Sequence, residues 1–128
     1  KKIKNKYKVF INNGLTNTNM DLVDWVNIVQ NEGAGEILVN SIDRDGSKIG
    51  YDFKILNQLK NKIKVPLIFC GGVGHWKDFK MALKKKEIDA VAAANIFHHF
   101  DQSDYLAKDY LIKNKIKNIR PPNFFKDK

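Results

Sequence analysis

The chain has 128 residues, of which 43% are hydrophobic and 11% aromatic, so it is long and apolar enough for one folded domain and too apolar to be disordered. Its 23 Lys and Arg exceed its 14 Asp and Glu, which gives a formal net charge of +9. This charge suits an anionic partner such as a phosphorylated metabolite, a nucleic acid or a membrane surface. The lysines are scattered among asparagines, and this pattern favours a solvated surface over a nucleic-acid site.

Cys70 is the only cysteine, so an intrachain disulfide and a cysteine-rich zinc site are excluded. No apolar run approaches the ~20 residues of a membrane helix, and the basic start lacks the apolar core of a signal peptide. We therefore expect a soluble, cytoplasmic protein with no membrane or nucleic-acid partner. Because Lys1 is not an initiator methionine, we also expect a chain that was processed or cut, or the ordered part of a longer one.

The first third of the chain predicts a short strand or hairpin arm followed by a helix. Residues Tyr7 to Ile11 carry the strand pattern, and the polar segment from Asn12 to Asn19 is rich in turn and capping residues, so we expect the helix to begin there. That helix has one apolar stripe and ends before Gly33; the stripe consists of Leu22, Trp25, Val26 and Val29.

The rest of the chain alternates strands and helices. Strands are predicted at Glu36 to Ser41, Val65 to Cys70 and Ile88 to Ala94. The expected helices are one from about Asp52 with Ile55, Leu59 and Ile63 on its apolar face, one with Trp76, Phe79 and Leu83, and a last one, capped by Ser103, through Leu106 and Tyr110. The tail from Pro121 to Lys128 looks irregular. This order predicts a parallel α/β protein, whose ligands bind at the carboxyl ends of the strands in an open sheet or a barrel.

Two aspartates follow the first of these strands. Asp43 and Asp45 are two residues apart, and alternate side chains of an extended backbone point to the same side. In an extended loop both carboxylates would therefore face one side and could act as general acid and base. The alternative is that they cap the following turn. A calcium loop is not expected, because Lys54 stands at its twelfth position, where a bidentate Glu is required.

Small residues follow the next two strands. Gly71, Gly72 and Gly74 lie between a strand and a helix start, where bare backbone N–H groups favour an anion, although a tight turn alone would also explain them. The run from Ala92 to Asn95 has the same position one strand later. Together the two segments match the phosphate site that α/β barrels build after strands seven and eight.

A cysteine, two histidines and a glutamate could also carry chemistry or a buried charge. Cys70 at a strand end could be a nucleophile, but no histidine stands in a motif with it, so a small packed residue is favoured. The adjacent His98 and His99 point to different faces, and no metal site is expected. Glu36 shares the parity of Asn40, which would place it inside a barrel at the end opposite the site; alternatively, it is a helix-to-strand hinge neutralised by a lysine.

Several of these segments together resemble a known family. They are Gly33-Ala34-Gly35-Glu36-Ile37-Leu38, Ser41-Ile42-Asp43-Arg44-Asp45-Gly46, Gly50-Tyr51-Asp52, Cys70-Gly71-Gly72 and Ala93-Ala94-Asn95-Ile96-Phe97-His98. In order and spacing they resemble the C-terminal half of the cyclase subunit of imidazole glycerol phosphate synthase, from about Tyr7 to Arg120. The resemblance implies that residues 1–128 form half of a (β/α)8 TIM barrel, with strands 6 to 8 and their helices.

The resemblance also implies an activity. The family are lyases of histidine biosynthesis that take ammonia from a glutamine amidotransferase partner and close an imidazole ring on a doubly phosphorylated ribulosyl substrate; no cofactor is implied. Asp45 would be the loop aspartate near the reacting centre, and Glu36 the charged gate for ammonia. The expected substrate and phosphate ligands are Asn13, Asn40, Cys70, Gly71, Gly72, Ala94 and Asn95.

The sequence departs from the family in two ways. The family's two principal catalytic aspartates end strands one and five, which this chain lacks, so we expect it to be inactive alone and to pair with an N-terminal half-barrel or with itself. The hydroxyl residues usual at Asn13, Asn40 and Cys70 are replaced, which suggests a related branch that supports amidination of surface-polysaccharide sugars. A non-catalytic half-barrel that only binds phosphate is the remaining alternative.

Overall fold

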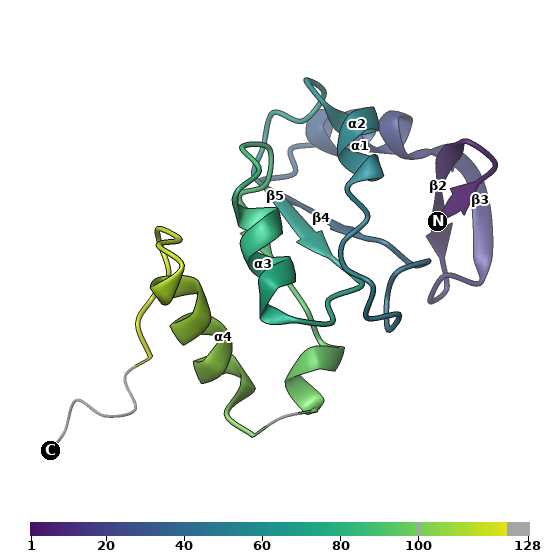
Figure 1. Cartoon of the computed structure of the whole chain (residues 1–128). Helices are drawn as coiled ribbons and strands as arrows, with labels where there is room; N and C mark the ends of the chain where they lie inside the picture. Colours follow the sequence, from purple (N-terminus) through teal and green to yellow (C-terminus); the bar gives the residue numbers. More distant parts are fainter. Residues whose placement is uncertain (100, 123–128) are drawn as a thin grey trace, which may run out of the picture.

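Three parallel strands, each followed by a helix, form the body of the protein in a computed structural model that describes residues 1–99 and 101–122 (Figure 1). The strands are β4 (Ile37–Asn40), β5 (Leu67–Cys70) and β6 (Ala90–Val91), in that order. Ile37 pairs with Leu67 and Ile68 with Ala90 in parallel register. The predicted parallel α/β architecture is confirmed, and the sheet is open rather than closed into a barrel.

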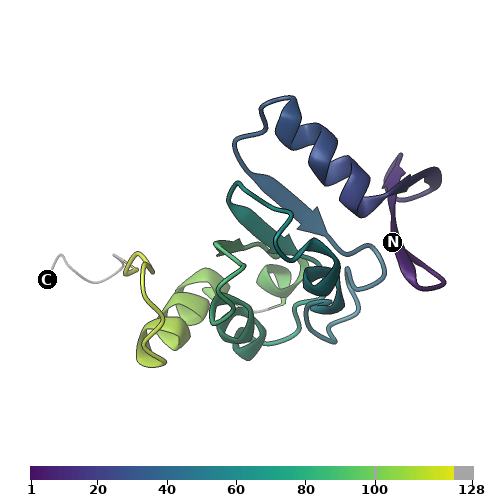
Figure 2. The same cartoon turned by 90° about the horizontal axis from the view of Figure 1, so that it is seen from above.

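The helices are α1 (Leu22–Asn31), α2 (Lys54–Leu59), α3 (Trp76–Leu83) and α4 (Ser103–Lys113), with a 3-10 turn η1 (Asn95–His98) before α4. Seen from above, they follow one another in an arc around the strands (Figure 2). Their apolar faces bury one side of the sheet, where Phe69 lies at the centre of the core. No helix within residues 1–99 and 101–122 has the length and apolar character needed to cross a membrane.

A three-stranded antiparallel sheet precedes this body, and we call it the N-terminal hairpin after its main pair, β2 and β3. Its strands are β1 (Lys2–Ile3), β2 (Lys6–Ile11) and β3 (Thr16–Asp21). The strand near Tyr7 was predicted, but β3 was not, because its sequence has no alternating apolar pattern. Pairing with β2 and an ion pair of 2.7 Å between Lys8 Nζ and Asp21 hold β3 in place, so α1 begins only after Asp21.

Two predicted helix boundaries differ from the structure. The second helix stops at Leu59, before the expected Ile63, because Lys60 is extended and Asn61 has a positive φ of 61°. Ser103 does not cap the last helix; Gln102 is the N-cap, and the Ser103 hydroxyl donates to the Phe97 carbonyl instead. Part of the predicted irregular tail, residues 123–128, lies outside the described residues.

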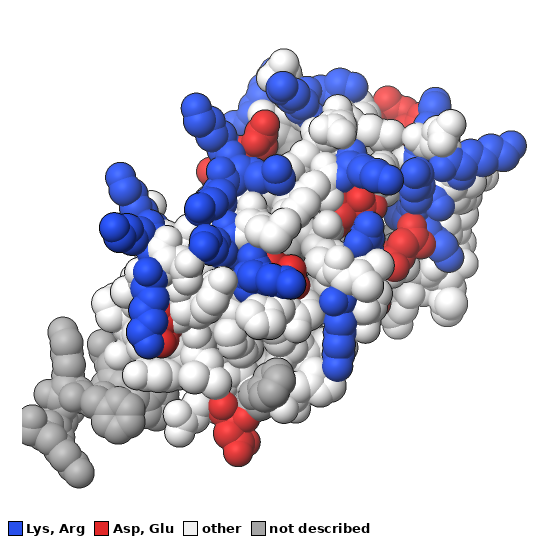
Figure 3. All heavy atoms as spheres, in the orientation of Figure 1, with Lys and Arg blue, Asp and Glu red and all other residues white. Residues whose placement is uncertain are grey.

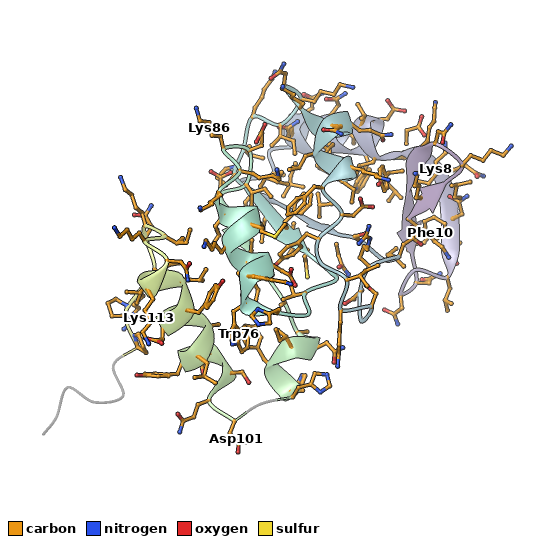
Figure 4. All side chains as sticks on the ribbon, viewed as in Figure 1. Lys8, Phe10, Trp76, Lys86, Asp101 and Lys113 are labelled. Atoms are coloured by element: carbon orange, nitrogen blue, oxygen red, sulfur yellow. The ribbon has the colours of Figure 1, made fainter. Side chains whose placement is uncertain are left out.

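Basic side chains spread over much of the face seen in Figure 3 and are interrupted by acidic and uncharged groups. This distribution agrees with the solvated surface expected from the scattered lysines. Figure 4 marks the two ends of the sheet: Trp76 lies at the start of α3, on the side of the carboxyl ends of the strands, and Lys86 lies in the loop on the opposite side.

Candidate functional site

A small pocket lies where the loops after β4, β5 and β6 meet, at the carboxyl ends of the strands. Its lining consists of Asp45, Gly46, Gly71, Gly72, Val73, Ala93, Ala94 and Asn95. Five residues proposed from the sequence as site residues are therefore neighbours in space. Small side chains and bare backbone form most of the surface, which is the kind of cradle that an anion can approach closely.

Glycines allow the loops after β4 and β5 to pack closely against each other. Gly72 has a φ of 103°, and its carbonyl accepts a 2.7 Å hydrogen bond from the Gly50 N–H. A side chain at Gly72 would collide with the Gly50 carbonyl oxygen, and one at Gly71 would lie 2.6 Å from Asn40 Oδ1. Packing between the loops thus requires these glycines, in addition to any need of a ligand.

The loop after β4 is a tight turn rather than an extended segment. The Asp45 N–H donates to the Ser41 carbonyl at 2.9 Å, and the Asp45 carboxylate accepts from Asn40 Nδ2 at 3.3 Å. Asp43 instead accepts a 2.6 Å hydrogen bond from the backbone N–H of Lys2 in the hairpin. The prediction that both carboxylates face one side is therefore wrong, because the turn directs them to different partners.

Asn40 and Cys70 end neighbouring strands and pair in register. Cys70 is half-buried, and burial, with a smaller effect of the Asp45 charge, raises the pKa of its thiol. The thiol therefore stays protonated at neutral pH, which agrees with a packed residue better than with a nucleophile. Within the described residues, no group of three or more His, Cys, Asp or Glu side chains could hold a metal ion.

Asn13 and Glu36 lie away from the pocket lining. Asn13 occupies the exposed turn between β2 and β3 with a φ of 54°. Glu36 precedes β4 and is exposed, so the expected burial of its charge is wrong for this chain. The reason is that, within residues 1–99 and 101–122, no element covers the face of the sheet that carries Leu38 and Asn40.

Two buried tyrosines, which no sequence pattern singled out, support the site. The Tyr51 hydroxyl donates to the Ala92 carbonyl at 3.0 Å and so ties the loop after β4 to the end of β6. The Tyr7 hydroxyl donates to the Asp52 carboxylate at 2.6 Å. The Gly50-Tyr51-Asp52 segment of the resemblance contained the only signal for either contact.

Comparison with known proteins agrees with this arrangement. A sequence-family profile described as "Histidine biosynthesis protein" matches residues 2–103. Proteins named imidazole glycerol phosphate synthase subunit HisF are similar along most of the chain. The relative from Clostridium botulinum (strain 657 / Type Ba4) is 42% identical over 113 residues, and that from Hydrogenobaculum sp. (strain Y04AAS1) is 43% identical over 110 residues.

The chain spans less than half the length of these relatives. The alignments cover 88% of this chain and 45% of the Clostridium protein, and 86% and 44% for the Hydrogenobaculum protein. A third relative, from Natranaerobius thermophilus, is 42% identical over 91% of this chain and 47% of its own length. Proteins of this family are TIM barrels, and the alternating parallel strands and helices correspond to part of one. The chain is therefore a member of the histidine biosynthesis protein family, related to subunit HisF of imidazole glycerol phosphate synthase.

Proposed function

We propose that the chain forms the phosphate-binding C-terminal half, residues 1–128, of a barrel synthase of the imidazole glycerol phosphate synthase type. The observation that carries this proposal is the common pocket of Asp45, the Gly71-Gly72 loop and the Ala94-Asn95 loop. Membership of the family supplies the reaction class. The +9 charge of the chain favours approach of a phosphorylated substrate.

In this proposal the pocket binds one phosphate of a doubly phosphorylated ribulosyl substrate. Gly71, Gly72, Ala94 and Asn95 contribute backbone and amide donors, and the bare backbone permits close approach. The Asn95 amide is already oriented, because its Oδ1 lies 3.1 Å from His99 Nε2. The sugar chain would then extend from the phosphate over the end of β4.

In this proposal, Asp45 moves a proton on the reacting part of that substrate. The amide of Asn40 contacts its carboxylate and limits its orientation. Ammonia would come from a glutamine amidotransferase partner, pass Glu36 at the amino ends of the strands and enter the imidazole ring that closes. The enzyme would be a cytoplasmic lyase of histidine biosynthesis. Asn13 would contact the substrate only if the turn between β2 and β3 moved toward the pocket.

This chain alone is expected to be inactive as a cyclase. The two principal catalytic aspartates of the family stand at the ends of strands one and five, outside the part matched here. In addition, the open sheet would leave the substrate exposed to water. Formation of imidazole product by the 128-residue chain alone would contradict this expectation.

Phosphate binding can be tested on the chain itself. Titration calorimetry with inorganic phosphate should give binding that Ala94→Glu abolishes, because Ala94 is exposed at the pocket and a carboxylate there repels the anion without disturbing the core. Leu15→Glu is the matched control, since Leu15 lies in the hairpin turn and is 84% exposed. Equal binding by the parent and the Ala94 variant would refute the phosphate site.

The reaction requires the complete barrel and its amidotransferase. Supplied with the ribulosyl substrate and ammonium, the parent should form the imidazole product, and Asp45→Asn should lower kcat more than KM. No product from either ammonium or glutamine would refute the histidine-pathway assignment.

A second candidate is the related branch that supports amidination of surface-polysaccharide sugars. The contact between the Asn40 amide and Asp45 favours it, because an amide here replaces the hydroxyl usual in the histidine enzyme and offers different donors to a substrate. A non-catalytic half-barrel would bind phosphate equally well, and it predicts no turnover in the complete assembly.

A further inference from the structure

Asn95 contributes a side-chain amide to the pocket at the carboxyl ends of the strands. An amide has a donor end, Nδ2, and an acceptor end, Oδ1, and half a rotation of the group exchanges the two. Phosphate oxygens accept hydrogen bonds, so the Nδ2 end can bind a phosphate and the Oδ1 end repels it. The rotation of this amide therefore decides whether the third loop of the pocket favours an anion.

His99 fixes this rotation. Its Nε2 atom lies 3.1 Å from Asn95 Oδ1. Because an amide oxygen can only accept a hydrogen bond, the imidazole must carry a proton on Nε2 for this contact to form. With Oδ1 engaged in this way, Nδ2 is the end of the amide that remains for a ligand.

The backbone between these two residues is the η1 turn, which is anchored in the protein. Ile96 of this turn is buried. The Phe97 ring stacks on the rings of Trp76 and Phe79 in α3, at centroid distances of 6.2 and 6.0 Å, and Figure 4 labels Trp76. Since packing holds the turn, the imidazole and the amide meet without further ordering of the chain, as in a preorganised site.

We propose that His99 is a positioning residue of the phosphate site, which holds the Asn95 amide with its Nδ2 directed at the bound phosphate; this role rests on the proposed function. His99 lies outside the pocket lining and acts through Asn95 rather than on the ligand. It acts as a hydrogen-bond donor, and a neutral imidazole with its proton on Nε2 is sufficient.

A purely structural role for His99 would be to close the η1 turn. Its backbone N–H donates to the Ile96 carbonyl at 3.4 Å, at the C-cap position of this turn. Any residue can form that backbone contact, whereas the contact with Asn95 requires a donor on the side chain. Substitution of the side chain therefore distinguishes the two roles.

Titration calorimetry of the chain with inorganic phosphate tests the proposal, at about pH 8, where free histidine is neutral. His99→Phe keeps a flat ring and removes the donor. It should weaken phosphate binding about threefold to tenfold, the usual effect of one hydrogen bond. Its thermal unfolding should match that of the parent, because His99 is exposed.

His98→Phe is the matched control. It makes the same substitution one position earlier, at an exposed residue outside the pocket lining, and should bind phosphate like the parent. His99→Gln provides the rescue, since its side-chain amide again offers an N–H donor, and it should retain most of the affinity that His99→Phe loses.

A double-mutant cycle shows whether His99 acts through Asn95. Asn95→Ser replaces the amide by a hydroxyl that rotates freely and needs no partner to present its proton. In that background His99→Phe should cause no further loss of phosphate affinity. A loss as large as in the parent background would overturn the proposal, because His99 would then act on the ligand directly.

The remaining outcomes are equally distinct. Equal phosphate binding by the parent and His99→Phe would overturn the positioning role and leave the phosphate site itself intact. A lower unfolding temperature of His99→Phe with unchanged affinity would assign the contact to stability alone. Absence of binding by the parent would refute the phosphate site together with the role of His99, so the parent titration separates the two failures.

Discussion

The Tyr7 hydroxyl donates a buried 2.6 Å hydrogen bond to the Asp52 carboxylate, and this contact joins the N-terminal hairpin to the segment that carries Asp45. The other oxygen of Asp52 accepts from the Lys54 N–H at the start of α2. At the opposite end of the same segment, Asp43 accepts from the Lys2 N–H. The hairpin thus holds the loop after β4 at both ends, and Asp45 lies between the two contacts.

Tyr7→Phe should destabilise the chain by about 1–3 kcal/mol, because it leaves a buried carboxylate oxygen without its donor. Urea unfolding followed by circular dichroism measures the change. Tyr105→Phe is the comparison, since Tyr105 is only partly buried on α4. Identical midpoints for Tyr7→Phe and the parent would show that the hydrogen bond contributes nothing.

The free energy of unfolding should fall as the pH rises above 10, which is the ordinary pKa of tyrosine. Burial raises the pKa of Tyr51, and burial together with the Asp52 carboxylate raises the pKa of Tyr7. The unfolded tyrosines lose their protons first, so the stability present below pH 10 is lost above it. The free energy of unfolding between pH 9 and about pH 11 should therefore decrease less in Tyr7→Phe than in the parent. Parallel curves for the two proteins would contradict this assignment.

Gly72→Ala should destabilise the chain by more than about 1 kcal/mol, because the backbone there has a positive φ that strains an alanine and the added side chain collides with the Gly50 carbonyl. Gly35→Ala provides the control, since its φ is not positive and a Cβ there meets no atom. Thermal unfolding compares the two variants. If Gly72→Ala and Gly35→Ala unfold at the same temperature, the close contact between the loops after β4 and β5 is not rigid.

Asp78→Ala should fray the start of α3 and lower the free energy of unfolding by about 1 kcal/mol. The reason is that the Asp78 carboxylate accepts hydrogen bonds of 2.9 Å from the N–H groups of Gly74 and His75. Asp104→Ala is the comparison at the first turn of α4, where no side-chain cap forms. Amide exchange at Gly74 and His75 should accelerate only in the Asp78 variant; unchanged exchange would exclude the cap.

Patterns of apolar spacing predicted most of the body of the fold. The stripe through Leu22 and Val26 located α1, and the continuous run to Cys70 located β5, because burial of these side chains decides both structures. The polar strand β3 could not be predicted in this way, since its stability comes from pairing with β2 rather than from its own pattern. In the part of the chain that the structure describes, the strand predicted from Ile88 pairs only at Ala90 and Val91, because β5 is the one neighbour of β6 there.

The sequence also predicted which loops form the pocket, but not how they are oriented. Small residues at corresponding positions after β5 and β6 identified the shared edge, and this inference needed only the parallel topology. The separation of Asp43 from Asp45 depends on a turn closed by the Ser41 carbonyl and on a hairpin distant in sequence. Alternation of side chains holds only in extended backbone, so parity could not reveal it.

The contact between Gly50 and Gly72 restricts how the pocket can diversify. Gly72 cannot acquire a side chain without displacing the Gly50 carbonyl, and Gly50 itself has a φ of 87° that disfavours any side chain, so a change at Gly72 demands a compensating change in the loop of Gly50. Ala94 is exposed at the third loop and meets no such restriction. A designer who wishes to retune the ligand preference of this scaffold should therefore randomise position 94 first and leave the glycine pair untouched.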